Sequence, residues 1–157
     1  MLDDTIDSVR KISRDLMPGT LEKFGLSQAV NEKSERFQTT TGLPIAFEEI
    51  GETLPLGKTR ELMIFRIIQE LLNNALKHAE ATAIKIVFVN GDQLEVVVED
   101  NGKGFNAEEH KFDRTPGKGL GLFNIENRAR LAGAIVEFLV PPTQGSKIII
   151  KVPYEKI

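Results

Sequence analysis

Apolar side chains recur at steps of three and four residues from residue 64 to residue 79, which predicts a helix that buries one broad face. The apolar positions are Ile64, Phe65, Ile68, Leu71, Leu72, Ala75, Leu76 and Ala79. The polar positions share the remaining stripe, and they are Arg66, Glu70, Asn73, Asn74 and Lys77. Paired asparagines inside a helix carry a propensity penalty without a gain in packing, so this stripe suggests a functional surface.

The rest of the chain alternates between helical and strand-like patterns. Helices are predicted at residues 3–16 and at residues 120–132. Between them the pattern restarts at residue 20, and a helix capped by Ser27 is predicted to run to about residue 40. Strands are predicted at residues 44–50, 83–89, 93–99, 134–140 and 147–152, with Asn90-Gly91 as the turn of a hairpin. This order predicts an α/β two-layer sandwich, in which helices cover one face of a mixed, mostly antiparallel sheet.

Composition limits the kinds of partner. The chain has 157 residues and 41% hydrophobic content, enough for one domain plus an extra element. The net charge of −3 and the pI of about 5.5 give no basic field for nucleic acid or an anionic membrane. There is no cysteine, which excludes disulfides and thiolate metal sites. The longest apolar runs are strand-sized, so no membrane contact is expected from this segment.

Two further polar motifs follow the central predicted helix. Asp100 stands where a strand ends and a turn with Gly102 and Gly104 begins. A carboxylate there could accept a hydrogen bond from an exocyclic amine such as adenine N6. The segment 117–121, Gly-Lys-Gly-Leu-Gly, precedes the last predicted helix, where unblocked N–H groups favour phosphate. It is not a phosphate-binding P-loop, because no Ser or Thr follows Lys118.

Together, the three motifs resemble the asparagine box and the two glycine boxes of the GHKL (Bergerat-fold) ATPases, the superfamily of DNA gyrase, heat-shock chaperone ATPases, mismatch-repair ATPases and sensor histidine kinases. The resemblance covers residues 59–153 and includes Gly145-Ser146 as the last glycine element. The Asn74-x-x-Lys77-His78 spacing is similar to the histidine-kinase form of the box. Residues 10–30 and 131–134 are similar to the nitrate-sensor type of kinase.

The resemblance implies a role for each motif residue. Asn74 would bind Mg²⁺, and Glu70 would be the catalytic residue that orients or polarises the nucleophile or a water molecule. Asp100 would bind adenine, and residues about 105–118 would form a lid over ATP. The other residues implied to contact ATP are Lys77, His78, Gly102, Gly104, Lys118, Gly119, Leu120, Gly121 and Ser146.

The resemblance also implies a domain organisation. Residues 1–18 would end the second helix of a dimerisation and phosphoacceptor hairpin, and residues 19–157 would form the catalytic domain. The acceptor histidine of such kinases lies on the first helix of the hairpin, so this segment is expected to bind ATP without phosphorylating itself. The implied partners are the acceptor helix of a full-length, dimeric kinase and a response regulator. The implied location is cytoplasmic, including the cytoplasmic part of a membrane-anchored sensor.

Two other functions remain open at this point. An anti-sigma-factor serine kinase would share the domain, although the pattern in residues 3–30 argues against it. A regulatory or interaction module could keep the fold and bind nucleotide without turnover. A gyrase-like or mismatch-repair-like ATPase is less favoured, because this sequence shows no transducer-like segment after residue 157.

Overall fold

The computed structural model describes residues 18–77, 81–102, 120–139 and 145–154, with the main chain alone for residues 120–124. Four helices and five strands follow one another along this part of the chain. In order they are α2 (Gly19–Phe24), α3 (Leu26–Thr41), β1 (Ile45–Ile50), α4 (Lys58–Lys77), β2 (Ile84–Asn90), β3 (Gln93–Asp100), α6 (Leu120–Leu131), β4 (Ile135–Leu139) and β5 (Ser146–Pro153). The helix predicted at residues 3–16 lies outside the described residues.

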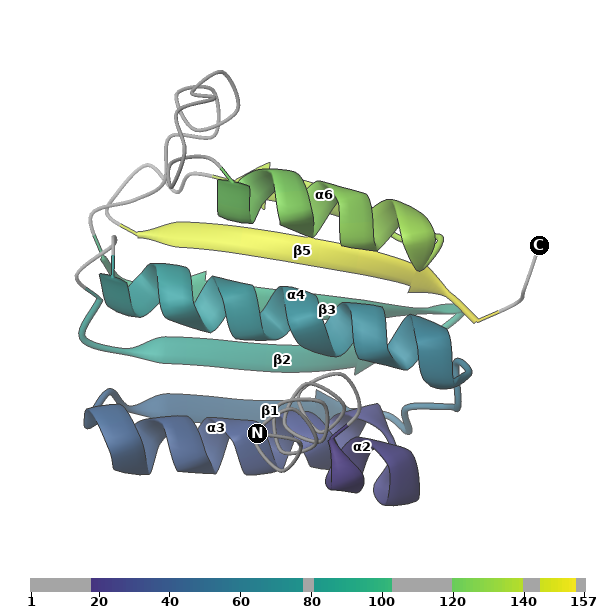
Figure 1. The fold of residues 1–157 in the computed structure, drawn as a ribbon, viewed down its shortest axis with the longest axis horizontal. Coiled ribbons are helices and arrows are strands. Elements are labelled where there is room, and N and C mark those ends of the chain that lie inside the picture. The colour runs from purple at the N-terminus through teal and green to yellow at the C-terminus, as the bar shows by residue number, and fades with distance from the viewer. Residues whose placement is uncertain (1–17, 78–80, 103–119, 140–144, 155–157) are drawn as a thin grey trace, which may run out of the picture.

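The five strands form one sheet in the order β1-β2-β3-β5-β4. Strand β1 runs parallel to β2, and the other three neighbouring pairs are antiparallel. Helices α3, α4 and α6 lie across one face of this sheet and contact β1, β3 and β4 respectively (Figure 1). The predicted two-layer sandwich with a mixed, mostly antiparallel sheet is therefore confirmed.

Alternation along the strands separates the core from the open face of the sheet. The helix-facing positions of the three central strands are buried and apolar: Ile84, Ile86 and Phe88 in β2, Leu94, Val96 and Val98 in β3, and Ile148, Ile150 and Val152 in β5. The opposite face carries ion pairs between neighbouring strands. Lys147 pairs with Glu99 over 3.4 Å, and Lys151 pairs with Glu137 over 3.1 Å. The core therefore lies between the sheet and the helices.

Helix α4 is the long central helix, and it begins six residues before the predicted start. Its buried apolar residues are Ile64, Phe65, Ile67, Ile68, Leu71, Leu72 and Ala75. Leu76, which the pattern placed on this face, is 40% exposed. The buried face of the helix is narrower in the last turn, because Ala75 is the one buried residue among residues 74–77.

The predicted cap at Ser27 is wrong. Helix α3 begins at Leu26 with Gly25 as its N-cap, and no side chain caps it. Leu26 is buried, so packing of this first residue into the core sets the start of the helix. Gly25 has φ 92° and ψ −178°, a conformation that glycine adopts without strain, and it separates α2 from α3.

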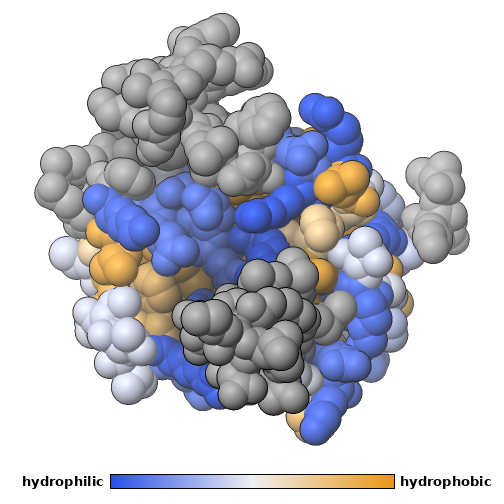
Figure 2. Space-filling model, viewed as in Figure 1, coloured by the Kyte–Doolittle hydropathy of each residue, from blue (hydrophilic) through white to orange (hydrophobic). Residues whose placement is uncertain are grey.

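The helix-covered face of the molecule is mostly hydrophilic, with smaller apolar areas between the polar side chains (Figure 2). This distribution fits helices that turn one apolar stripe to the core and a polar stripe to solvent. None of the helices in the described ranges combines the length and the hydropathy that a membrane span requires.

Candidate functional site

Strand pairing brings Asp100 and Ser146 together. The two residues are register partners at the end of β3 and the start of β5. The Ser146 hydroxyl donates to Oδ2 of Asp100 over 2.5 Å, and the main-chain N–H of Gly102 donates to Oδ1 over 2.8 Å. Ser146 is 6% exposed, and Asp100 is half-buried. Two internal donors therefore fix the orientation of the Asp100 carboxylate.

The carboxylate keeps free acceptor positions in this arrangement. An ionised carboxylate has about four lone-pair sites, and each internal donor occupies one. The Ser146 hydroxyl donates its single hydrogen to Asp100, so its oxygen can act only as an acceptor toward a further group. The pair thus presents acceptors to a ligand with N–H donors, such as the exocyclic amine of adenine.

Gly145 lets the chain pass directly beside Asp100. Its φ is 107°, and a Cβ at this position would lie 2.2 Å from the carbonyl oxygen of Asp100. It would also lie 3.2 Å from the Cα of Asn101. The neighbouring atoms belong to the main chain, so no side-chain rotation can relieve the overlap. The residue before Ser146 must therefore be glycine for β5 to keep its register with β3.

Asn101 has a structural role at this site that the sequence analysis did not assign. Its Oδ1 accepts hydrogen bonds from the main-chain N–H groups of Thr82 (2.8 Å) and Ala83 (3.0 Å). Its Nδ2 donates to the Thr82 hydroxyl over 2.8 Å. Asparagine in a turn commonly bonds main-chain groups, but only the fold shows that these lie 18 and 19 residues earlier. Asn101 therefore attaches the Asp100 turn to the segment that leads into β2.

The carboxyl-terminal half of α4 carries the other described candidates. Glu70 and Asn74 are half-buried, and Lys77 is exposed. The chain returns to this end of the helix through a hydrogen bond from the N–H of Ala81 to the carbonyl of Ala75 (3.4 Å). The end of α4, the end of β3, the start of β5 and the first turn of α6 all lie at one end of the sheet, on the left in Figure 1. The predicted site residues that the structure describes thus gather at this end.

Other predicted site residues lie outside the described ranges: His78, Gly104, Lys118 and Gly119, together with the proposed lid at residues 105–118. Leu120 and Gly121 form the start of α6, of which the main chain is described. Within the described ranges, no cluster of three His, Asp or Glu side chains could hold a metal ion.

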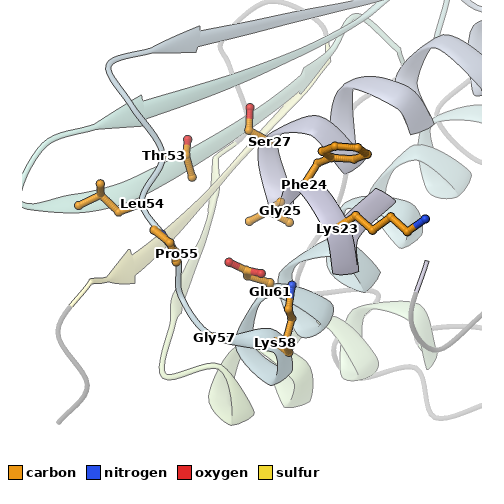
Figure 3. Close-up of a pocket in the computed structure, with 11 residues that line it drawn as sticks. Lys23, Phe24, Gly25, Ser27, Thr53, Leu54, Pro55, Gly57, Lys58 and Glu61 are labelled. Atoms are coloured by element: carbon orange, nitrogen blue, oxygen red, sulfur yellow. The ribbon is translucent and has the colours of Figure 1, made fainter. Parts of the chain in front are cut away.

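A cavity of about 350 Å³ opens beside the first turn of α4, away from the predicted site residues. It lies between the α2–α3 junction, the loop before α4 and the first turn of α4, and Glu61 is one of the residues that line it (Figure 3). Glu61 is buried, and its Oε2 accepts a hydrogen bond from the N–H of Leu56 over 3.0 Å. Glu61 therefore holds the loop against the start of α4, and none of the predicted site residues lines this cavity.

Comparison with known proteins identifies the family. Residues 59–156 match the model of the family described as "Histidine kinase-, DNA gyrase B-, and HSP90-like ATPase". This match covers more than half of the chain, and the chain belongs to this family. The predicted superfamily is therefore confirmed.

Curated relatives align along nearly the whole chain. The chain is 29% identical over 154 residues to the "Signal transduction histidine-protein kinase/phosphatase DegS" of Brevibacillus brevis, covering 98% of the chain and 39% of that protein. It is 30% identical over 154 residues to the "Sensor histidine kinase LiaS" of Bacillus subtilis (strain 168), covering 98% and 41%. It is 29% identical over 149 residues to the "Oxygen sensor histidine kinase NreB" of Staphylococcus carnosus (strain TM300), covering 94% and 42%. The chain thus spans about two fifths of each relative.

Solved structures confirm the fold. The histidine kinase domain of the blue-light activated histidine kinase from Erythrobacter litoralis EL346 superposes with a TM-score of 0.62 at 21% identity, covering 82% of this chain and 61% of that one. Full-length ShkA in complex with AMPPNP superposes with a TM-score of 0.64 at 23% identity, covering 82% of this chain and 29% of that one.

Proposed function

We propose that this member of the family is the ATP-binding catalytic domain of a two-component sensor histidine kinase. The domain binds Mg-ATP and transfers the γ-phosphoryl group to a histidine on the dimerisation helix of the longer, dimeric protein. A response regulator then receives the phosphoryl group. The names of the aligned relatives support this function. The observation that carries it is the Asp100 carboxylate, which Ser146 and Gly102 orient at the same end of the sheet as the carboxyl terminus of α4.

The adenine ring binds at Asp100 in this proposal. The exocyclic amine donates to the carboxylate, and the Ser146 oxygen accepts from a bound water or from the ligand. Guanine has a carbonyl oxygen in place of the adenine amine, so it would set an acceptor against the carboxylate. The site therefore favours ATP over GTP.

The phosphates bind between α4 and α6. Lys77, His78 and Lys118 would supply positive or donor groups to the phosphates, and the main-chain N–H groups of Gly119, Leu120 and Gly121 would donate to the phosphate oxygens. The closure of residues 105–118 over the nucleotide excludes water.

Asn74 fits a magnesium site that depends largely on the nucleotide. Its side-chain amide offers one hard oxygen ligand from a half-buried position. Bound magnesium would neutralise charge on the phosphates. Glu70, one helical turn before Asn74, orients the attacking imidazole or polarises a water molecule. Because phosphoryl transfer depends mainly on positioning and charge neutralisation, these groups suffice for the reaction class.

The transfer itself is an exchange of one bond to phosphorus. The bond between the γ-phosphorus and the β,γ-bridging oxygen breaks, and that oxygen leaves with the electron pair as part of ADP. The lone pair of an imidazole nitrogen forms the new P–N bond. Since the cytoplasm supplies ATP and response regulators, we place this domain there.

Calorimetric titration with Mg-ATP and Mg-GTP tests the proposal. Asp100→Asn replaces an acceptor by a group of the same shape that also donates, and ATP affinity is expected to fall by about tenfold or more. Asn74→Ala should make the remaining ATP binding less sensitive to magnesium. Asp92→Asn, an exposed aspartate in the β2–β3 hairpin, is the matched control and should change nothing.

The same Asp100→Asn change in the full-length protein should abolish the acid-labile phosphohistidine formed from labelled ATP. A folded wild-type chain that binds no nucleotide would refute the proposal and indicate an interaction module. Labelling of serine on a copurifying protein would instead indicate a serine kinase.

A further inference from the structure

We propose that Arg60 is a positioning residue for the phosphate half of the nucleotide site, and that it acts through α6. Arg60 lies in the first turn of α4, at the opposite end of the helix from Asn74 and Lys77. It touches neither nucleotide nor magnesium in the function proposed above, on which this inference rests.

The Arg60 side chain joins three elements that are distant in the sequence. Its Nε donates to the carbonyl of Ala132 over 2.9 Å, and its Nη2 donates to the carbonyl of Pro153 over 2.5 Å. Ala132 follows the last residue of α6, and Pro153 ends β5; they lie 72 and 93 residues from Arg60. Figure 1 shows the start of α4 and the ends of α6 and β5 gathered at the right-hand end of the molecule.

The contact with Ala132 should be strong and hard to replace. The carbonyls at the end of a helix lack intrahelical donors and carry the negative end of the helix dipole, which a guanidinium stabilises. Ala132 is 1% exposed, so its carbonyl has little access to bulk water. Without Arg60 this acceptor would lose its charged donor in a poorly solvated position, and the end of α6 would shift or admit water.

Helix α6 is a rigid element, so a shift at its carboxyl-terminal end also moves its amino-terminal end. Helix α6 has 12 residues and is therefore about 18 Å long. Its buried side chains in the described part are Ile125 and Ala129, followed by Ala132. Packed helices can slide past one another by small shear motions, and a contact that holds one end of a helix opposes such sliding. Arg60 thus fixes the axial position of α6 along α4, and with it the distance between the start of α6 and Asn74.

The adenine half of the site depends less on this attachment, because Arg60 contacts β5 at Pro153, the end of the strand opposite to Ser146. Asp100 and Ser146 belong to β3 and β5, whose register is set by the sheet. Loss of the Arg60 contact should therefore weaken binding of the phosphates and leave binding of the adenosine part unchanged. A general loss of folding would weaken both.

The experiment compares ATP with adenosine in the same calorimetric titration. Arg60→Met keeps an unbranched apolar stem and removes all donors. ATP affinity is expected to fall by roughly three- to tenfold, while adenosine affinity stays within about twofold of wild type. Arg60→Lys keeps one charged donor and should restore part of the ATP affinity.

Lys58→Met is the matched control. Lys58 lies in the same turn of α4 and also donates to two main-chain carbonyls, those of Leu21 (3.4 Å) and Glu22 (2.5 Å) in α2. Because these contacts hold α2 and not α6, both affinities should be unchanged.

Each outcome decides the inference. Unchanged ATP affinity in Arg60→Met overturns it, and so does an equal loss for ATP and adenosine. If Arg60→Met does not fold, Arg60→Lys gives the same comparison of the two ligands. Failure of the wild-type chain to bind ATP at all would reject the proposed function. That result is distinct from a change in the ratio of ATP affinity to adenosine affinity in a chain that still binds both ligands.

Discussion

Replacing Gly145 by alanine is expected to destabilise the fold and disturb the Asp100 site together. The new Cβ would lie 2.2 Å from the carbonyl oxygen of Asp100, well inside the van der Waals distance of about 3.3 Å between carbon and oxygen. It would also lie 3.2 Å from the carbonyl carbon of the same residue. The strand pair must therefore separate locally by about 1 Å or lose its register.

Two contributions set the loss in folding stability that Gly145→Ala should cause. A non-glycine residue at φ 107° costs about 1–3 kcal/mol in backbone strain. Displacing main-chain atoms to relieve the overlap costs about 1–3 kcal/mol more, by analogy with overpacked cores. The sum of about 2–6 kcal/mol is a large share of the 5–15 kcal/mol that stabilises a typical domain. Because the displaced atoms belong to Asp100, ATP affinity should fall as well.

Urea denaturation of three alanine variants separates the contributions. Gly25 has φ 92° with open space where a Cβ would go, so Gly25→Ala measures strain alone. At Gly91 an added Cβ would meet open space, and the backbone φ lies outside the left-handed region. Gly91→Ala should therefore change the free energy of unfolding by less than about 1 kcal/mol. The loss in free energy of unfolding should be larger for Gly145→Ala than for Gly25→Ala by at least about 1 kcal/mol. Equal values for these two variants, or unchanged ATP affinity in Gly145→Ala, would refute the overlap argument.

Two more predictions concern polar contacts. Asn101→Ala removes the acceptor for the N–H groups of Thr82 and Ala83. Urea denaturation should therefore show a free energy of unfolding lower by about 1–3 kcal/mol. Tyr154→Phe removes the donor to Asn90 and the acceptor for the N–H of Leu54, and should cost about 1 kcal/mol at pH 8. Desolvation by burial raises the Tyr154 pKa above 10 in the folded protein, so its contribution is present below pH 10 and is lost as pH rises through the folded value. Urea midpoints measured from pH 8 to 11 should show this loss in the wild type and a flatter profile in Tyr154→Phe; parallel profiles would contradict it.

Short-range patterns in the sequence sufficed for the elements of secondary structure and the fold class. The 3.6-residue period predicted the buried face of α4 from Ile64 to Ala75, and the Asn90-Gly91 turn predicted the β2–β3 hairpin. These signals work because helix and strand periodicity depend on neighbours a few residues apart. The predicted helix cap at Ser27 was wrong, because burial of Leu26 decides where α3 begins. The predicted burial of Leu76 was also wrong, because the buried face of α4 narrows in its last turn.

The sequence by itself determined which residue types stand at the ends of the elements: Asp100 after a strand, glycines in the turns, and asparagine and lysine late in a long helix. Only the tertiary structure decided which of them meet. Ser146 reaches Asp100 across 46 residues because β5 pairs with β3, and the same pairing makes Gly145 indispensable. Arg60 reaches Ala132 and Pro153 because α4 and α6 pack on one sheet. Such contacts depend on strand register and helix packing, which no local pattern of residues encodes.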